Sequence, residues 1–370
     1  MEKVELKKIE PTVISILKKL YRQNQEKRRN QATDAYYNRS APKAYQTLIK
    51  QLPELALNPQ QEKEIETYAA DVFGSASFSP WLKVFTACRG EFVEGWMPLD
   101  YWARIVCPTL NGSLQPVGKI KTLTQKFLNA EELPDLAYHV KGNWLLASGE
   151  KTNPGELRKI LFDAYPSVFL KQDNTSRGGG VMKIDADQFS KLDFDKLGDF
   201  VIQSPIEAHE FFKKLSPAAV PSLRVTTYKA PAQPARVVQS GIRLGLVGTP
   251  FIYEDDCIRI AIRITDGVTH DFGFSGDWQI LKAHSETGVP ITGLQVPKYP
   301  EIKKLCEKLH DQNPHFGLIA WDMTVDKNDQ IKIMEWNTVT PAFNMDEAAI
   351  GPHFKGLGFE DFWKRKNPGR

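Results

Sequence analysis

The chain is poor in cysteine, lacks long hydrophobic runs and carries little net charge. Its four cysteines are far apart and form no C-x-x-C pair, which argues against a zinc site or a disulfide framework: Cys88, Cys107, Cys257 and Cys306. No run approaches the roughly 20 apolar residues that cross a bilayer. The first residues, MEKVELKKIEPTV, mix acids and bases, unlike a secretory signal. We therefore expect a cytoplasmic protein with reduced thiols and no membrane partner.

A formal charge of +3 is small for 370 residues and indicates no strongly charged partner. Basic residues gather between Lys18 and Arg29, where a solvated helix face is a simpler explanation than nucleic-acid binding. The contents of hydrophobic residues (41%) and charged residues (25%) are ordinary for a globular protein. A chain of this length exceeds a usual single core, which predicts two or three lobes.

Apolar patterns of helical and strand type alternate irregularly along the chain. Residues 1 to about 75 show helical spacing, and further helices are expected at about 119–130, 154–162, 206–215 and 299–311. Strands are expected at 144–147, 167–172, 181–184, 200–203, 222–228, 236–247, within 250–264, and as a final pair in GLIAWDMTVDKNDQIKIMEWNTV. Strands partly in hairpins and mixed with helices indicate an α+β fold rather than a doubly wound parallel sheet.

The most informative segment is 318–339, where the apolar strands LIAWDMTV and IKIMEWNTV flank a polar turn. If the turn is residues 327–330, the opposed pairs are Asp326 with Ile331, Asp322 with Glu335, and Ala320 with Asn337. On the other face we expect packed side chains, namely Trp321, Met323, Val325 and Met334. Two opposed carboxylates have β-carbons about 5 Å apart, so a proton or a cation must lie between them.

Such a pair predicts a site for a hard divalent cation. Mg²⁺ prefers carboxylate and amide oxygens and keeps positions open for substrate phosphates, so Asp322, Glu335 and Asn337 are candidate ligands. The alternative is an edge hairpin with solvated acids. Flanking Trp, Ile and Met residues argue against that alternative, because they are unusual neighbours for a solvated surface.

A glycine loop lies between two predicted strands in VFLKQDNTSRGGGVMKI. Gly178, Gly179 and Gly180 allow backbone N–H groups to approach an anion closely, and Lys171 on the first strand can reach the same anion. Glycine-rich hairpin tips without ligands are common, so the loop alone is a weak signal. It is no Walker loop, because no G-K-[S/T] follows. The DFG at 271–273 lacks an H-R-D partner and is interpreted as coincidence.

In order, these motifs resemble the ATP-grasp superfamily, and most closely its sugar-transfer-associated branch, which is related to D-alanine–D-alanine ligase. The resemblance runs from about Tyr101 to Thr340. Its pieces are FLKQDNTSRGGGV, the hinge strand FVIQSPIEAH, the arginine motifs SLRVTTY and GIRLG, the segment HSETG, GLQVPKYPEI, and the WDMTV and EWN pair spaced by thirteen residues. The sequence YEDDCIRIAI departs from the Asp-Asn and Gly-Gly pairs expected after the second arginine strand, so substrate specificity does not carry over.

The resemblance implies two α+β lobes that clasp ATP, preceded by a mainly helical region. Its boundaries would be 1–113, 114–202 for the small lobe and 203–370 for the large lobe. Nucleotide-binding residues would be Lys121 (or Lys119), Lys171, Ser176, Arg177, Gly178, Gly179, Gly180, Gln203, Ser204, Ile206 and His209. Arg224, Arg243 and His284 would be catalytic, and Asp322, Glu335 and Asn337 would hold Mg²⁺. Arg224, Arg243, His284 and His209 each have a structural alternative, as surface ion pairs, a turn residue or an exposed side chain.

The implied reaction is ATP- and Mg²⁺-dependent joining of a carboxylate to an amine through an acyl phosphate. Both substrates would be small molecules. One alternative is a phosphotransferase that acts on a hydroxyl group. The other is a nucleotide-binding module without turnover, which the intact set of metal ligands argues against.

Overall fold

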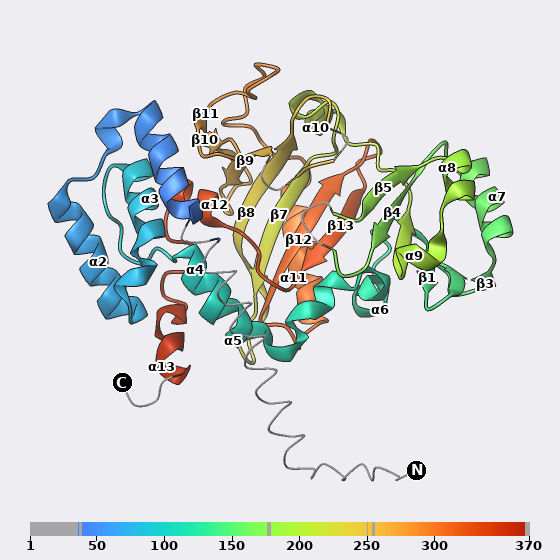
Figure 1. Ribbon diagram of the computed structural model, residues 1–370, viewed down its shortest axis with the longest axis horizontal. Coiled ribbons are helices and arrows are strands. Elements are labelled where there is room, and N and C mark those ends of the chain that lie inside the picture. Colours follow the sequence, from blue (N-terminus) through green and yellow to red (C-terminus); the bar gives the residue numbers. More distant parts are fainter. Residues whose placement is uncertain (1–35, 37–38, 176–178, 250, 254–255, 367–370) are drawn as a thin grey trace, which may run out of the picture.

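Two antiparallel sheets and a helical region build the protein (Figure 1). The fold is described from a computed structural model, for residues 36, 39–175, 179–249, 251–253 and 256–366. Helices and mainly antiparallel strands are mixed along the chain, which confirms the predicted α+β class. Residues 1–35, which are part of the predicted helical region, lie outside the described residues.

The sheet of the small lobe has six strands in the order β3-β2-β1-β6-β4-β5. They are β1 (Asp135–Val140), β2 (Asn143–Leu146), β3 (Lys151–Thr152), β4 (Val168–Gln172), β5 (Val181–Ile184) and β6 (Phe200–Gln203). Three helices accompany them: α7 (Pro154–Ala164), α8 (Ala186–Lys191) and α9 (Phe194–Leu197). Leu157 and Phe189 of the helices are buried with Leu170 and Ile202 of the sheet, so this lobe has its own core. Strand β1, at its centre, is not among the predicted strands.

The sheet of the large lobe has seven strands in the order β11-β10-β9-β8-β7-β12-β13. They are β7 (Ser222–Tyr228), β8 (Arg236–Gly245), β9 (Cys257–Ile262), β10 (Thr269–Phe274), β11 (Ile280–Leu281), β12 (Leu318–Val325) and β13 (Ile331–Asn337). Helix α11 (Tyr299–Asp311) contributes Ile302, Cys306 and Leu309 to the core on one face of this sheet. The other face packs partly against α12 (Asn344–Ile350), and it also carries Arg224, Arg243 and Asp322. A short helix, α10 (Glu210–Leu215), follows the hinge strand β6.

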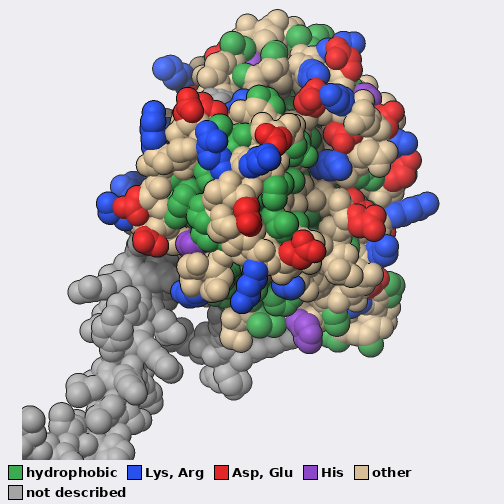
Figure 2. Space-filling model, turned by 90° about the vertical axis from the view of Figure 1, so that its right-hand side faces the viewer, with side chains coloured by type: hydrophobic (Ala, Val, Ile, Leu, Met, Phe, Trp, Pro, Cys, Tyr) green, Lys and Arg blue, Asp and Glu red, His purple; other side chains and the backbone are tan. Residues whose placement is uncertain are grey.

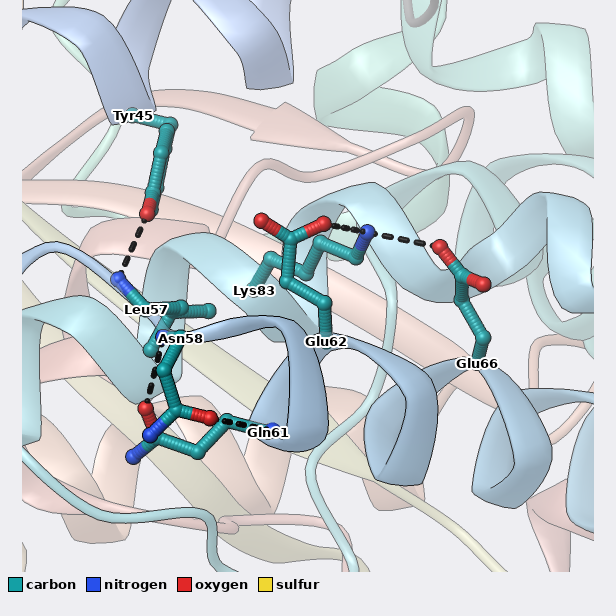
Figure 3. A network of polar contacts seen from close by, with 7 residues as sticks. All are labelled: Tyr45, Leu57, Asn58, Gln61, Glu62, Glu66 and Lys83. Carbon is teal, nitrogen blue, oxygen red and sulfur yellow. Dashed lines mark hydrogen bonds and ion pairs between the residues drawn. The ribbon is translucent and has the colours of Figure 1, made fainter.

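The N-terminal helical region consists of a helix at 39–51, α2 (Pro59–Phe73), α3 (Ser79–Arg89), α4 (Leu99–Tyr101) and α5 (Cys107–Asn111). Helix α2 begins with a capping box, in which Asn58 and Gln61 exchange side-chain and backbone hydrogen bonds (Figure 3). Lys83 of α3 pairs with Glu62 and Glu66 of α2 at 2.8 and 2.7 Å, which ties the two helices together.

The helix predicted at 119–130 is mostly wrong. The chain there forms the single-turn or 3₁₀ segments η4 (Gly112–Lys119) and η5 (Lys121–Leu123), followed by the short helix α6 (Thr124–Leu128). Ile120, with φ −96° and ψ 85°, has a non-helical backbone and interrupts the pattern. Other short turns are η1 (Pro53–Leu55), η2 (Ala76–Phe78), the π-type η3 (Trp102–Val106) and η6 (Phe359–Asp361).

The end of the chain packs against the N-terminal region. Helices α12 (Asn344–Ile350) and α13 (Phe362–Lys366) lie beside α2, α3 and η3, and one core includes Trp81 and Trp102 together with Phe343 and Phe354. Glu347 of α12 is fully buried, and its carboxyl oxygens accept hydrogen bonds from the N–H groups of Met97 and His353, both at 3.1 Å. This core contains residues from both the predicted region 1–113 and the predicted region 203–370. The boundaries between these regions remain a prediction.

The surface of the small-lobe end carries acidic and basic side chains interspersed with one another (Figure 2). In the part of the chain that the structure describes, no helix is both long and apolar enough to cross a bilayer. All four cysteines are free, as predicted.

Candidate functional site

A cavity of about 400 Å³ opens between the two sheets. It is lined by β4, β5 and β6 of the small lobe and by β7, β8, β12 and β13 of the large lobe. Most predicted site residues line it: Lys119, Lys121, Lys171, Gly179, Gln203, Ser204, Ile206, Arg224, Arg243, Asp322, Glu335 and Asn337. Residues from positions 36 to 342 of the chain are thus brought to one place.

The paired carboxylates face each other as predicted. In the hairpin of β12 and β13, Asp322 lies opposite Glu335, and Ala320 lies opposite Asn337. The predicted pairing of Asp326 with Ile331 is wrong, because Val325 occupies that position. Asp326 instead closes the turn, since its carboxylate accepts hydrogen bonds from the N–H groups of Asn328 and Gln330.

A β-bulge explains why Asp322 still lies opposite Glu335, although the pairing next to the turn differs by one residue from the prediction. The register shifts between Asp322 and Met323, so Met323 pairs with Ile333 and Met334 is the extra residue. Trp321, Met323 and Val325 are fully buried on the far face, as predicted. The prediction for Met334 is wrong, because its side chain lines the cavity. Its carbonyl accepts a hydrogen bond of 3.1 Å from the Lys171 ammonium.

Asp322 is paired with an arginine. Arg224, directly opposite on β7, donates from Nε and Nη2 to the two carboxylate oxygens at 2.6 and 3.0 Å. Burial would raise the pKa of Asp322, but the charges of Arg224, Arg243 and Lys171 outweigh it and lower that pKa. For Glu335 the balance is reversed, since burial and the neighbouring Asp322 raise its pKa against the charges of Lys121 and Lys171.

The oxygens present suit Mg²⁺. The Glu335 carboxyl makes no hydrogen bond to any described residue, although Glu335 lines the cavity and is partly buried. The Asn337 side-chain carbonyl accepts from the N–H of Val339 at 2.9 Å and keeps a second lone pair. Asp322, Glu335 and Asn337 would therefore hold the ion. The hydrogen bonds from Arg224 to Asp322 would then either remain beside the ion or be replaced by it. Within the described ranges no group of three or more His, Cys, Asp or Glu side chains offers another metal site.

Two lysines bring positive charge to the carboxylate pair. Lys171, on β4, lies among Glu335, Asp135 and Asp322, whose charges oppose the lowering of its pKa by burial. Lys121 is 7% exposed and donates to the carbonyls of Gln172 and Thr175. It therefore secures the base of the glycine loop, and both lysines can contact phosphates in the cavity.

The described ends of the glycine loop border the cavity from the small lobe. Gly179 lines the cavity, and Gly180 has φ +72°. A Cβ at Gly180 would lie 2.6 Å from Cγ2 of Thr175, so only glycine fits there. Ser176, Arg177 and Gly178 lie outside the described residues.

Two predicted histidines do not line the cavity. His284 is buried, lies 3.1 Å from the carbonyl of Gly245 through Nε2, and accepts at Nδ1 from the N–H groups of Glu286 and Thr287. It therefore fits the alternative of a turn residue. His209 caps helix α10 by accepting from the N–H of Phe211, and its Nε2 lies 3.3 Å from Asp329. Local backbone bonding explains both positions.

A second, small chamber adjoins the cavity and contains residues that sequence reasoning missed. Its volume is about 20 Å³, and it shares Arg224, Arg243 and Ala342 with the main cavity. Arg259, opposite Arg243 on β9, and Asp346 of α12 complete its walls. The alternation in CIRIAI places Arg259 on a defined face of its strand, so its register with GIRLG was the available signal.

The Asp346 carboxyl packs against strand β8 at Gly241, where the absence of a side chain leaves space for it. A Cβ at Gly241 would lie 2.7 Å from Oδ1 of Asp346, while Oδ2 accepts a hydrogen bond from the Gln239 amide. Burial raises the pKa of Asp346 to about 7, although Arg259, Arg243 and Arg224 oppose the shift. The chamber thus combines three guanidinium groups with a carboxyl that changes charge near neutral pH.

We expect Asp346 to make stability depend on pH. With a pKa of about 7 folded and 3.8 as its ordinary value, the native state binds more protons than the unfolded state between these limits. The free energy of unfolding therefore falls as pH rises, by about 3 kcal/mol from pH 5 to pH 8 for this group. Urea unfolding at pH 5 and pH 8 measures this fall in the free energy of unfolding. In Asp346→Asn the fall should be smaller than in the wild type by about 3 kcal/mol.

Burial also raises the pKa of Glu347, so the test is the difference between wild type and variant. Asp329→Asn, on the exposed hairpin turn, is the control and should retain the wild-type pH dependence. Equal losses in wild type and Asp346→Asn would contradict the raised pKa.

Comparison with known protein families identifies a relationship. The family described as sugar-transfer-associated ATP-grasp matches residues 171–355, half of the chain. No curated protein matches the sequence.

Among solved structures, the D-alanine–D-alanine ligase of Coxiella burnetii has 13% identity, a TM-score of 0.39, and alignment over 68% of this chain and 60% of its own. The D-alanyl-alanine synthetase A of Vibrio cholerae has 15% identity and a TM-score of 0.39, with alignment over 68% of this chain and 65% of its own. The N5-carboxyaminoimidazole synthetase of Staphylococcus aureus has 10% identity and a TM-score of 0.36, with alignment over 62% of this chain and 46% of its own. The chain thus spans less than two thirds of the length of these proteins. The assignment depends on the family match: the chain belongs to the sugar-transfer-associated ATP-grasp family, as the sequence motifs indicated.

Proposed function

We propose that the protein is an ATP- and Mg²⁺-dependent ligase that phosphorylates a substrate carboxylate and joins it to an amine. One observation carries the proposal: Lys121, Lys171, Arg224 and Arg243 line the same cavity as the opposed carboxylates of Asp322 and Glu335. Membership of an ATP-grasp family assigns the chain to ATP-dependent enzymes. The reaction itself is our inference from the site.

The cavity has an apolar end and a charged end. Phe169, which lies opposite Gln203, and Ile206 provide apolar walls at the hinge, which suits a purine base. The lysines and the carboxylate pair form the charged end, which suits the phosphates and the ion. When bound there, Mg²⁺ would neutralise phosphate charge as it develops.

The protein's own residues would align the reactants and balance charge. A substrate carboxylate oxygen attacks the γ-phosphorus, the bond from that phosphorus to the bridging oxygen breaks, and ADP leaves. The amine then attacks the acyl carbon, inorganic phosphate leaves, and the amine loses a proton. Arg243 is placed to contact the acyl phosphate, because it borders both the main cavity and the small chamber. The chamber, with Arg259 and Asp346, would take part of the substrate.

Trapping with hydroxylamine tests this reaction. The full-length protein is incubated with MgATP, hydroxylamine and a panel of amino acids, dipeptides and sugar acids. Because hydroxylamine attacks an acyl phosphate, a competent carboxylate should give a hydroxamate together with an equal amount of ADP. Neither product is expected without the carboxylate.

The other outcomes identify the rival functions. ADP release with a stable phosphorylated product and no requirement for an amine would show a phosphotransferase. MgATP binding without ADP formation on any of the compounds would favour a binding module. Both results would overturn the ligase proposal.

A further inference from the structure

At the base end of the cavity, the Gln203 side chain can donate or accept a hydrogen bond. Gln203 ends strand β6 and lines the cavity beside the apolar Phe169, its partner on β4. A glutamine amide has a carbonyl acceptor on one side and an NH₂ donor on the other. Whichever group faces the base decides which purine edge finds a partner.

Asp135 determines which way this amide faces. It lies opposite Gln203 across the pairing of β1 and β6, and its Oδ1 accepts a 2.7 Å hydrogen bond from Nε2 of Gln203. Its other oxygen, Oδ2, accepts a 2.7 Å hydrogen bond from the Tyr138 hydroxyl. An ionised carboxylate can only accept, so the NH₂ group of Gln203 must point toward Asp135.

Asp135 stands behind Gln203 and not in the cavity. It lines a separate groove on the hinge side, together with Pro134, Tyr165 and Ser204. Burial raises the pKa of Asp135, while the hydrogen bonds from Gln203 and Tyr138 and the charge of Lys171 favour its ionised form. With Nε2 held on that side, the carbonyl Oε1 of Gln203 is the group left to face a base.

We propose that Asp135 is a positioning residue that fixes the Gln203 carbonyl toward the base site, so that the site selects a purine with an amino group at C6. An amino group there donates to Oε1. An oxo group at C6 would instead place two acceptors against each other and leave a buried acceptor without a donor. The inference depends on the proposed binding of a nucleotide in this cavity, and it adds the source of base selectivity.

Binding of ATP and ITP to the full-length protein tests the inference. The two nucleotides carry the same phosphates and ribose, while ITP has an oxo group in place of the amino group at C6. Titration calorimetry with Mg²⁺ present should show ATP binding on the order of tenfold more tightly than ITP to the wild type. In Asp135→Asn the amide can pair with Gln203 in either orientation, so the ATP/ITP ratio should fall to within about twofold of one.

Tyr138→Phe is the matched control. It removes the other partner of Asp135 and keeps the carboxylate, so the wild-type ratio should persist. Gln203→Met gives a second route to the same result, should Asp135→Asn fail to fold. It removes the carbonyl acceptor at similar length, and its ratio should also approach one.

Each contrary result has its own meaning. Equal affinity of the wild type for ATP and ITP would overturn the inference and leave the proposed function standing. A wild-type ratio retained in folded Asp135→Asn or in Gln203→Met would do the same. A wild type that binds neither nucleotide would overturn both the inference and the proposed function.

Discussion

Glu335→Gln and Asp322→Asn are each expected to lower turnover by at least about 10³-fold. Both carboxylates line the cavity and face each other across β12 and β13, where they would hold Mg²⁺. An amide keeps the shape and removes the charge, so the ion loses most of its binding energy. ADP release under saturating MgATP measures the loss.

The two variants should differ in stability. Glu335 is forced toward its neutral form by burial and by Asp322, so Glu335→Gln should leave the free energy of unfolding unchanged or raise it. Asp322→Asn should lower it, because the buried Arg224 guanidinium loses its charged partner. Asp329→Asn, on the exposed turn of the same hairpin, should retain full activity. Wild-type turnover in either Asp322→Asn or Glu335→Gln would exclude the metal role.

Lys171→Ala is expected to weaken MgATP binding by about 100-fold. The Lys171 ammonium donates to the Met334 carbonyl across the cavity and lies near Glu335 and Asp322. A hydrogen bond from a charged donor to a phosphate contributes about 2–3 kcal/mol, which corresponds to that change in affinity. Titration calorimetry with ADP or ATP in the presence of Mg²⁺ measures it.

Lys183→Ala provides the matched control for this lysine. Lys183 lies on the neighbouring strand β5 and is exposed, so its removal should leave nucleotide affinity within about twofold of the wild type. Unchanged affinity in Lys171→Ala would remove the assignment of this lysine to the phosphates. A comparable loss in both variants would point to a general change of the small lobe instead.

Short-range patterns predicted most of this fold. Strands 181–184, 200–203 and 222–228 and the helix 299–311 have the predicted bounds. They are strongly apolar or strongly periodic segments, and their ends are marked by Gly, Pro or polar residues. The opposed pair of Asp322 and Glu335 was also predicted, although from a turn one residue too short. The bulge at Met334 compensates for that error, and no alternation in the sequence marks it.

Features that depend on distant parts of the chain were not predictable in the same way. Asp346 reaches the site because α12 packs against α3, and because Glu347 of α12 accepts a hydrogen bond from the N–H of Met97. The periodicity of the sequence does not predict contacts between such distant segments. The predictions for His209 and His284 failed because of local contacts and not distant ones. Both histidines are bonded to backbone groups within three residues, so local turn chemistry decides their positions.

The core shared by the two ends of the chain has a consequence for synthesis on the ribosome. Trp81 and Trp102 precede both lobes in the sequence, while Phe343, Phe354 and Phe359, which complete their packing, follow both sheets and are translated much later. The small lobe, whose core lies between Ala137 and Ile202, can collapse while translation continues. Until the segment with Phe343, Phe354 and Phe359 leaves the exit tunnel, the aromatic side chains of the earlier helices lack these packing partners, and chaperones can bind them.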